Sequence, residues 1–312
     1  MVEYVIETRD LTKKFDTEIA VNSLNMHVEK GKIYGLLGKN GAGKTTTMCM
    51  LLNLARPSYG EIFIFGENPR SNPDLYSKIG SIIETPGFYE NLSAFDNLRI
   101  VSKLRGNYNS EDILRALEIV GLLDSKDKKF KNFSLGMKQR LGIAAAIMHN
   151  PEILILDEPI NGLDPIGIIE MRDLFKKLVH IYGTTIIISS HILSEIEVIA
   201  DVIGVMNKGV LVEELSKEEL QDKMNKYVEF EVSNLELACN ILDNYGLKKG
   251  SDYVISAFAE KYDSKTYNSL KLFSHLDKKA EFNRLFINSG IDVYKLNLTE
   301  ESLEEYFTEL IN

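Results

Sequence analysis

A glycine-rich segment near the N-terminus has the residue types and spacing that phosphate binding requires. It runs from Gly38 to Thr45 and fits the pattern G-x-x-x-x-G-K-[ST], which by average composition arises by chance in a chain of this length roughly once in a hundred. Glycines let the backbone turn tightly, so that successive N–H groups point at an anion from the positive end of the following helix. The Lys44 ammonium would contact the β- and γ-phosphates, and the Thr45 hydroxyl would complete the shell of a Mg²⁺ ion. The alternative is a helix N-terminus whose glycines serve packing alone.

A second candidate for chemistry is the acidic pair Asp157 and Glu158, which follows the apolar run 153–156. Such a run is typical of a central parallel strand covered on both faces, and open α/β sheets bind ligands at the carboxyl ends of their strands. Asp157 would hold Mg²⁺ through its water shell, and Glu158 would polarise an attacking water as general base. The alternative is a helix N-cap after a core strand, which would favour Asp but would not need both acids.

Strands and helices alternate along the first two thirds of the chain, and this alternation must position both candidate sites. Short apolar runs predict strands at 33–37, 62–65, 78–83, 153–156 and 184–189, and helices are expected at 44–54, 111–120, 134–148 and 166–182. The segment 91–150 is expected to be mostly helical. The order predicts a mixed α/β fold with a parallel central sheet.

After about residue 215 the pattern changes to that of a smaller domain. Tyr227–Val232 alternates with period two, as a half-buried strand does. Strands are expected at 227–232, 252–258, 270–273 and 291–296, and helices at 234–244, 278–288 and 300–310. This β-α-β-β-α-β order predicts a small α+β domain at 216–312, of ferredoxin-like layout, after a first domain at 1–215.

Composition narrows the classes of function. The 312 residues suffice for one large core and a smaller second one. A formal net charge of −10 argues against nucleic-acid binding, because phosphate contacts need clustered cations. The sequence contains no signal-peptide pattern and no apolar run long enough to span a membrane, which predicts a cytoplasmic protein. Cys49 and Cys239 fit no metal-site spacing; buried reduced thiols are expected, with a long-range disulfide as the alternative.

Further motifs, in one order along the chain, resemble those of the nucleotide-binding subunits of ABC transporters. Residues 133–140 resemble the signature motif of that family, with Leu135 and Met137 where Gly and Gln are commoner. Residues 161–164 resemble the D-loop, His191 resembles the switch histidine, and Phe15 matches the aromatic that stacks on adenine. Each of these residues has an alternative interpretation. Phe15 would be a core aromatic, His191 would be a capping or core histidine, and Ser134 would be only an N-cap.

The resemblance implies a P-loop NTPase fold with a RecA-like core, a helical subdomain at about 88–150, and ATP and Mg²⁺ as cofactors. It implies Glu158 and His191 as catalytic residues and Thr45, Glu84 and Asp157 around the metal. The implied nucleotide contacts are Phe15, Gly38, Lys39, Asn40, Gly41, Ala42, Gly43, Lys44, Thr45, Thr46, Ser134, Gly136 and Met137.

Glu84 departs from the family pattern, which usually has Gln at the start of the loop between core and helical lobe. A carboxylate can bind Mg²⁺ but cannot donate a hydrogen bond, and it would repel phosphate oxygens without the metal. Glu at this position, with the Ser-Leu-Gly-Met signature and the segment 298–307, resembles the bacitracin and lantibiotic export or self-protection branch.

One chain carries one phosphate loop and one signature motif, so the resemblance implies a head-to-tail pair of subunits with ATP between them. We expect two identical chains rather than two different ones. A separate membrane permease would supply the transport pathway, and the chain would lie at the cytoplasmic face of the cell membrane. One alternative is a non-transport relative that acts on ribosomes or DNA; another role, for the C-terminal region alone, is that of an interaction or sensing module.

Overall fold

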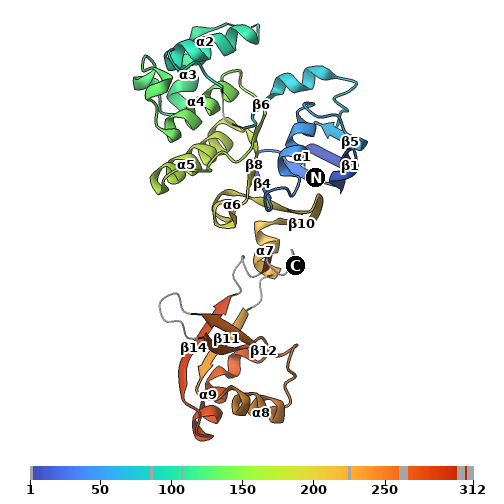
Figure 1. Cartoon of the computed structure of the whole chain (residues 1–312), viewed down its shortest axis with the longest axis vertical. Coiled ribbons are helices and arrows are strands. Elements are labelled where there is room, and N and C mark those ends of the chain that lie inside the picture. Colours follow the sequence, from blue (N-terminus) through green and yellow to red (C-terminus); the bar gives the residue numbers. More distant parts are fainter. Residues whose placement is uncertain are drawn as a thin grey trace. The chain divides into compact units, whose positions relative to one another are not determined.

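The computed structural model describes residues 3–84, 87–106, 108–223, 226–259, 266–300 and 306–307. The chain divides into two compact units between Glu218 and Glu219, close to residue 215, where the sequence pattern changes. Figure 1 shows the elements of each unit.

The first unit contains a largely parallel central sheet with the strand order β10-β9-β4-β8-β7-β6. Its strands are β4 (Ile33–Leu37), β6 (Ile79–Ile82), β7 (Ile153–Leu156), β8 (Thr185–Ser190), β9 (Val202–Asn207) and β10 (Val210–Ser216). Every residue of β4, β7 and β8 is buried, as the sequence predicts for strands covered on both faces. These three strands are adjacent and parallel, so the loops after them meet at one edge of the sheet.

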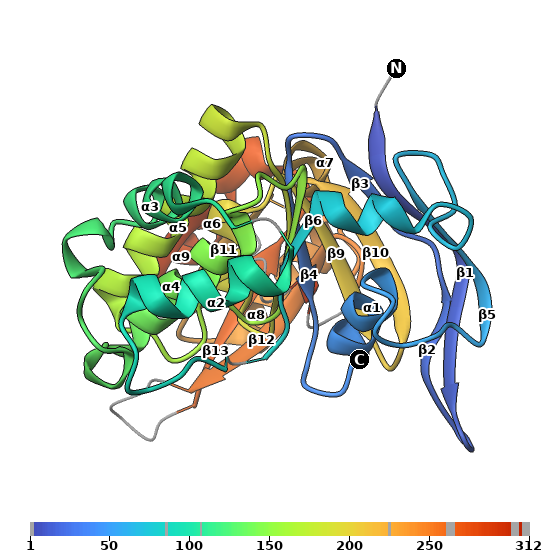
Figure 2. The same ribbon diagram turned by 90° about the horizontal axis from the view of Figure 1, so that it is seen from above.

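Helix α1 (Lys44–Leu51) lies between the central sheet and a second, antiparallel sheet, as Figure 2 shows. The second sheet consists of β1 (Tyr4–Phe15), β2 (Glu18–Leu24), β3 (His27–Glu29) and β5 (Tyr59–Ile64). Met48 of α1 shares one hydrophobic core with Ile6 of β1 and Leu36 of β4, so both sheets hold the helix. Of these strands the sequence predicts only β5, because β1 and β2 are half exposed and their pairing shifts register, which obscures the period-two pattern.

The predicted helical part of the first unit is present as α2 (Ala94–Leu104), α3 (Ser110–Ile119) and α4 (Leu135–Ile147). Each begins at a polar N-cap whose side chain accepts a backbone N–H, and the cap of α4 is the predicted Ser134. Helices α5 (Pro165–Tyr182) and α6 (Leu193–Ile199) pack on the central sheet.

The second unit begins within α7 (Lys217–Lys223) and contains a sheet of order β12-β13-β11-β14. Its elements are β11 (Lys226–Val232), α8 (Leu235–Tyr245), β12 (Tyr253–Ala259), β13 (Thr266–Leu272), α9 (Lys279–Asn288) and β14 (Val293–Glu300). Its strands pair antiparallel, and its helices pack on the sheet around Phe230, Phe282 and Phe286. This is the strand order of a split β-α-β fold.

Two expectations need correction. Glu300 ends strand β14 rather than beginning a helix. Of the predicted helix 300–310, Tyr306 and Phe307 are helical as expected, and 301–305 and 308–310 lie outside the described residues. Cys49 and Cys239 are free, so there is no disulfide between them, but both are half-buried rather than buried.

None of the helices in the described part of the chain is both long and apolar enough to span a bilayer.

Candidate functional site

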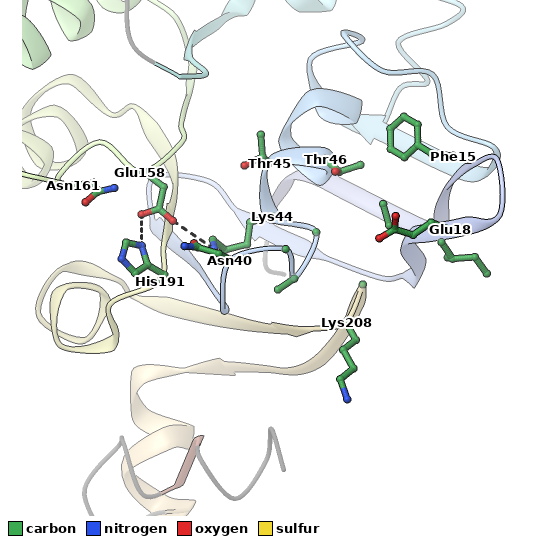
Figure 3. A pocket seen from close by; sticks show the side chains of 16 residues that line it. Phe15, Glu18, Asn40, Lys44, Thr45, Thr46, Glu158, Asn161, His191 and Lys208 are labelled. Carbon is green, nitrogen blue, oxygen red and sulfur yellow. Dashed lines mark hydrogen bonds and ion pairs between the residues drawn. The ribbon is translucent and has the colours of Figure 1, made fainter.

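A cavity of about 620 Å³ opens where the loops after β4, β7 and β8 meet. Figure 3 shows Phe15 at one end of this cavity, Glu158 and His191 at the other, and Lys44 and Thr45 between them. The residues that line it are Phe15, Glu18, Ile19, Ala20, Asn40, Gly41, Ala42, Gly43, Lys44, Thr45, Thr46, Glu158, Asn161, His191, Lys208 and Gly209. The tertiary structure thus brings together most of the residues that the sequence proposes for the nucleotide.

The phosphate loop connects β4 to α1, as the motif predicts. Gly43 has φ of 105°, in the left-handed region, and a Cβ there would lie 2.5 Å from the carbonyl oxygen of Ala20. A Cβ on Gly38 would lie equally close to the carbonyl oxygen of Met206. Both positions therefore require glycine. Helix α1 has no capping side chain and no acidic residue in its first turn, so its positive N-terminal end stays available to an anion.

Lys44 is buried at the bottom of the loop. Its ammonium donates a hydrogen bond to the carbonyl oxygen of Gly38 at 2.7 Å and lies 3.4 Å from Oε1 of Glu158. Carbonyl oxygens orient the ammonium without neutralising its charge. The lysine is therefore held in place beside one carboxylate, and its closest contact is a neutral oxygen.

Asp157 lies directly after β7, and its carboxylate is fixed by two hydroxyl groups. Thr45 donates to Oδ2 at 2.7 Å, and Ser189 of β8 donates a short hydrogen bond to Oδ1. The Ser189 hydroxyl also accepts the backbone N–H of Glu158 at 2.8 Å. Ser189 thus binds the carboxylate of Asp157 and the backbone of Glu158. The sequence does not single it out, because its partners are more than thirty residues away and only strand order brings them together.

Glu158 and His191 form the other end of the site. Glu158 has φ of 48°, which is uncommon for a residue with a side chain. One of its carboxylate oxygens lies 2.8 Å from Nδ1 of His191, and the other faces Lys44 (Figure 3). This geometry does not fit the alternative of a plain capping or core histidine. Glu158 also does not cap a helix, because the next helix, α5, is capped by Asp164.

The residues proposed for Mg²⁺ supply hard oxygen atoms. Thr45 and Asp157 are in direct contact, which matches an ion that proteins commonly hold with one or two side chains while phosphates and water complete the shell. Over the described ranges, no group of three or more His, Cys, Asp or Glu side chains forms a self-contained metal site. The donor set therefore fits an ion that enters with a nucleotide.

Glu84 follows β6 and is exposed, with φ of 65°, and it does not line the cavity. Burial raises the pKa of the Cys49 thiol, and the charges of Asp157 and Glu84 raise it further. Glu84 and Asp157 are therefore both close enough to act on Cys49, which lies one turn after Thr45 in α1. Thr85 and Pro86 of the same loop lie outside the described residues.

Ser134, Gly136 and Met137 do not line the cavity of their own chain. Ser134 accepts the backbone N–H of Met137 at 3.3 Å and caps α4. Gly38 and Lys39 also stay outside the lining, although they belong to the loop. The residues that line the cavity thus include most of the phosphate loop and none of the three signature-motif residues.

Phe15 ends β1, and its alternative assignment as a core aromatic is wrong, because half of the residue (50%) is exposed and its ring lines the cavity. Glu18 and Lys208 line the cavity as well, and no sequence pattern selects either. Glu18 begins β2 after the β1–β2 turn, and Lys208 lies in the turn between β9 and β10. Only the folded structure brings these two connections beside the phosphate loop.

Comparisons with known proteins identify the family of the chain. A protein-family model described as ABC transporter matches residues 21–161. The bacitracin transport ATP-binding protein BcrA of Enterococcus faecalis is 53% identical over 312 residues, which cover 100% of this chain and 97% of that protein. The lantibiotic transport ATP-binding protein SrtF of Streptococcus pyogenes is 45% identical over 230 residues, covering 73% of this chain and 99% of that protein.

A solved structure described as the ATP-binding subunit of an ABC transporter is similar in fold. It is 27% identical, with a TM-score of 0.62, and the match covers 70% of this chain and 92% of that one. The match to the bacitracin relative also extends through the second unit.

Proposed function

Because this chain belongs to the ATP-binding subunits of ABC transporters, we propose that it hydrolyses ATP to drive transport of peptide antibiotics of the bacitracin or lantibiotic type. The observation that carries the proposal is the placement of Glu158 between the buried Lys44 and His191, at one end of a cavity whose middle is the phosphate loop. The two relatives are named for bacitracin and lantibiotic transport, which supports this substrate class.

The reaction follows from the positions of the side chains. The triphosphate would lie along the phosphate loop at the N-terminus of α1, with the Lys44 ammonium on its β- and γ-oxygens. Thr45, Asp157 and Glu84 would hold Mg²⁺, whose chemistry there is to neutralise charge on those oxygens. Glu158 would accept the proton of the attacking water, and His191 would keep its carboxylate oriented.

A second copy would complete the site. Ser134, Gly136 and Met137 lie outside the cavity of their own chain, so a head-to-tail pair would place these residues of one chain on the nucleotide of the other. Ser134 at the N-terminus of α4 has the geometry for this, since a helix N-terminus facing out of the chain attracts an anion. We propose a pair of identical chains, because one chain carries one phosphate loop and one signature motif, so that two copies together form two complete nucleotide sites.

A membrane permease would be the transport partner and would hold the pair at the cytoplasmic face of the cell membrane. ATP would attract the two copies to each other, and hydrolysis would remove that attraction. This difference in binding energy is what can shift a permease between two states. The names of the relatives favour this role over one on ribosomes or DNA.

Glu158→Gln tests the chemistry. The amide keeps the shape of the side chain but cannot take a proton, so we expect MgATP to bind with near wild-type affinity while turnover falls about a hundredfold or more. Phosphate release and equilibrium binding should be measured on the same preparation. Hydrolysis at the wild-type rate would rule out Glu158 as general base. For the substrate class, cells that express the chain with its permease should lose resistance to bacitracin or a lantibiotic when Glu158→Gln replaces the wild type.

A further inference from the structure

The aromatic ring at one end of the cavity has a cation against it. The Lys13 ammonium lies 4.6 Å from the centre of the Phe15 ring. Phe15 lines the cavity (Figure 3), whereas Lys13 is not among its lining residues. The ring thus has a cation over it, and half of the residue stays exposed.

Lys13 is itself anchored to the chain that follows α1. Its ammonium donates a hydrogen bond to the carbonyl oxygen of Arg56 at 2.9 Å. The same connection holds the end of β1 at two more points, because the Lys14 N–H donates to the Ser58 hydroxyl at 3.0 Å and the Ser58 N–H donates to the carbonyl oxygen of Thr12 at 2.8 Å. Residues 56–58 therefore fix the strand that carries Phe15 relative to the helix that begins at the phosphate loop.

A cation on one face of a ring changes how the opposite face stacks. Two stacked aromatic faces both carry negative charge and repel each other electrostatically, and a cation behind one ring draws its electrons away. A purine base stacked on Phe15 would meet a ring that is polarised by Lys13 and already held in one orientation. Ordering the ring in advance also reduces the entropy lost on binding.

We infer that Lys13 is a positioning residue for the base of the nucleotide: it acts through Phe15 and contributes to binding of the base but not of the triphosphate. The inference rests on the proposed ATP site. It distinguishes Lys13 from Lys44, whose partner would be the phosphates alone.

The test compares Lys13→Met with Lys13→Arg in the full chain. Methionine keeps the apolar stem and removes the charge, whereas arginine keeps a cation that can still reach the ring. Lys14→Met is the matched control, since Lys14 is exposed and its loss changes the net charge equally. Calorimetric titrations measure Kd for MgATP and for magnesium tripolyphosphate, which carries the phosphates without a base.

We expect Lys13→Met to weaken MgATP binding about three- to tenfold and to leave tripolyphosphate binding unchanged. Lys13→Arg should restore most of the affinity, and Lys14→Met should change neither Kd. In Phe15→Ala the Lys13→Met change should have no further effect, because the two residues act as one unit.

Equal weakening of both ligands would overturn the inference, since it would mean that Lys13 supports the loop rather than the base. Unchanged MgATP binding in Lys13→Met would overturn it as well. Failure of the proposed function has a different signature, namely no saturable binding of MgATP by the wild-type chain, and that result would remove both.

Discussion

Each unit of the molecule holds a lysine beside a glutamate, and the two pairs are built differently. In the first unit, the Lys44 side chain is 6% exposed, and its closest contact is a carbonyl oxygen, with Glu158 farther away. In the second unit, the Lys295 side chain is 39% exposed and lies 2.9 Å from Glu229 and 3.2 Å from Glu231. One carboxylate, that of Glu158, faces the buried Lys44, whereas two carboxylates pair the charge of the more exposed Lys295.

We interpret this difference as one between a proposed binding group, Lys44, and a structural one, Lys295. A buried ammonium with one carboxylate beside it and a neutral carbonyl as its closest contact gains strongly when an anion arrives, because the low dielectric strengthens the new contact. A surface ammonium between two carboxylates has little left to gain. The hydrogen bond from Lys295 to Glu229 raises the pKa of the lysine, so this ammonium keeps its proton and its partners.

Matched substitutions should show the largest effect in the first unit. Lys44→Met keeps the length of the side chain and removes the charge, so we expect MgATP affinity to fall about tenfold to a hundredfold. Lys295→Met should leave that affinity unchanged. Equilibrium titration of both variants checks the comparison. Equal affinities in the two variants would contradict the role of Lys44.

A second contrast concerns pH. In the first unit, the Arg105 guanidinium lies 3.0 Å from Nδ1 of His149. Burial of His149, and next the positive charge of Arg105, lower the pKa of this histidine to about 4. The unfolded chain takes up this proton near pH 6.5, so between these values the unfolded state binds more protons than the folded state. The free energy of unfolding of the first unit should therefore fall as pH falls through this window, by about 1–3 kcal/mol from this group.

Urea unfolding at about pH 7 and about pH 4.5 checks this prediction, with His149→Gln as control. Glutamine does not titrate, so the variant should lose less stability between the two pH values than the wild type. Equal losses would show that His149 is not responsible.

The smallest effect is expected for the Lys295 cluster. Because the pKa of Lys295 is raised, its stabilisation is present below the ordinary lysine pKa and is lost as pH rises through the raised value. Lys295→Met should lower the free energy of unfolding by less than about 1 kcal/mol at neutral pH, since the side chain is more than a third exposed. Urea titration measures this change in the free energy of unfolding. A decrease of several kcal/mol would show that Lys295 and its carboxylates behave as a buried ion pair instead.

Much of the architecture follows from short sequence patterns. The run 153–156 forms the buried strand β7, Ser134 caps α4, and the glycine pattern lies between β4 and α1, because each signal is contained in a few consecutive residues. The second sheet was largely missed. Its strands β1 and β2 alternate imperfectly, and they are stabilised by pairing partners that no local pattern reveals.

The candidate site divides in the same way. The amino-acid sequence by itself determined the phosphate loop, the acidic pair and the family, since glycine, lysine and carboxylate at fixed spacing carry their chemistry with them. Only the tertiary structure decided that Ser189 holds both acids and that Lys13 lies against Phe15, anchored on Arg56. Most of these contacts join residues more than thirty positions apart, and even the close pair Lys13 and Phe15 is held by a segment some forty residues away. The order of the strands and the path of the connections bring such residues together. The spacing of residues along the chain does not encode the strand order.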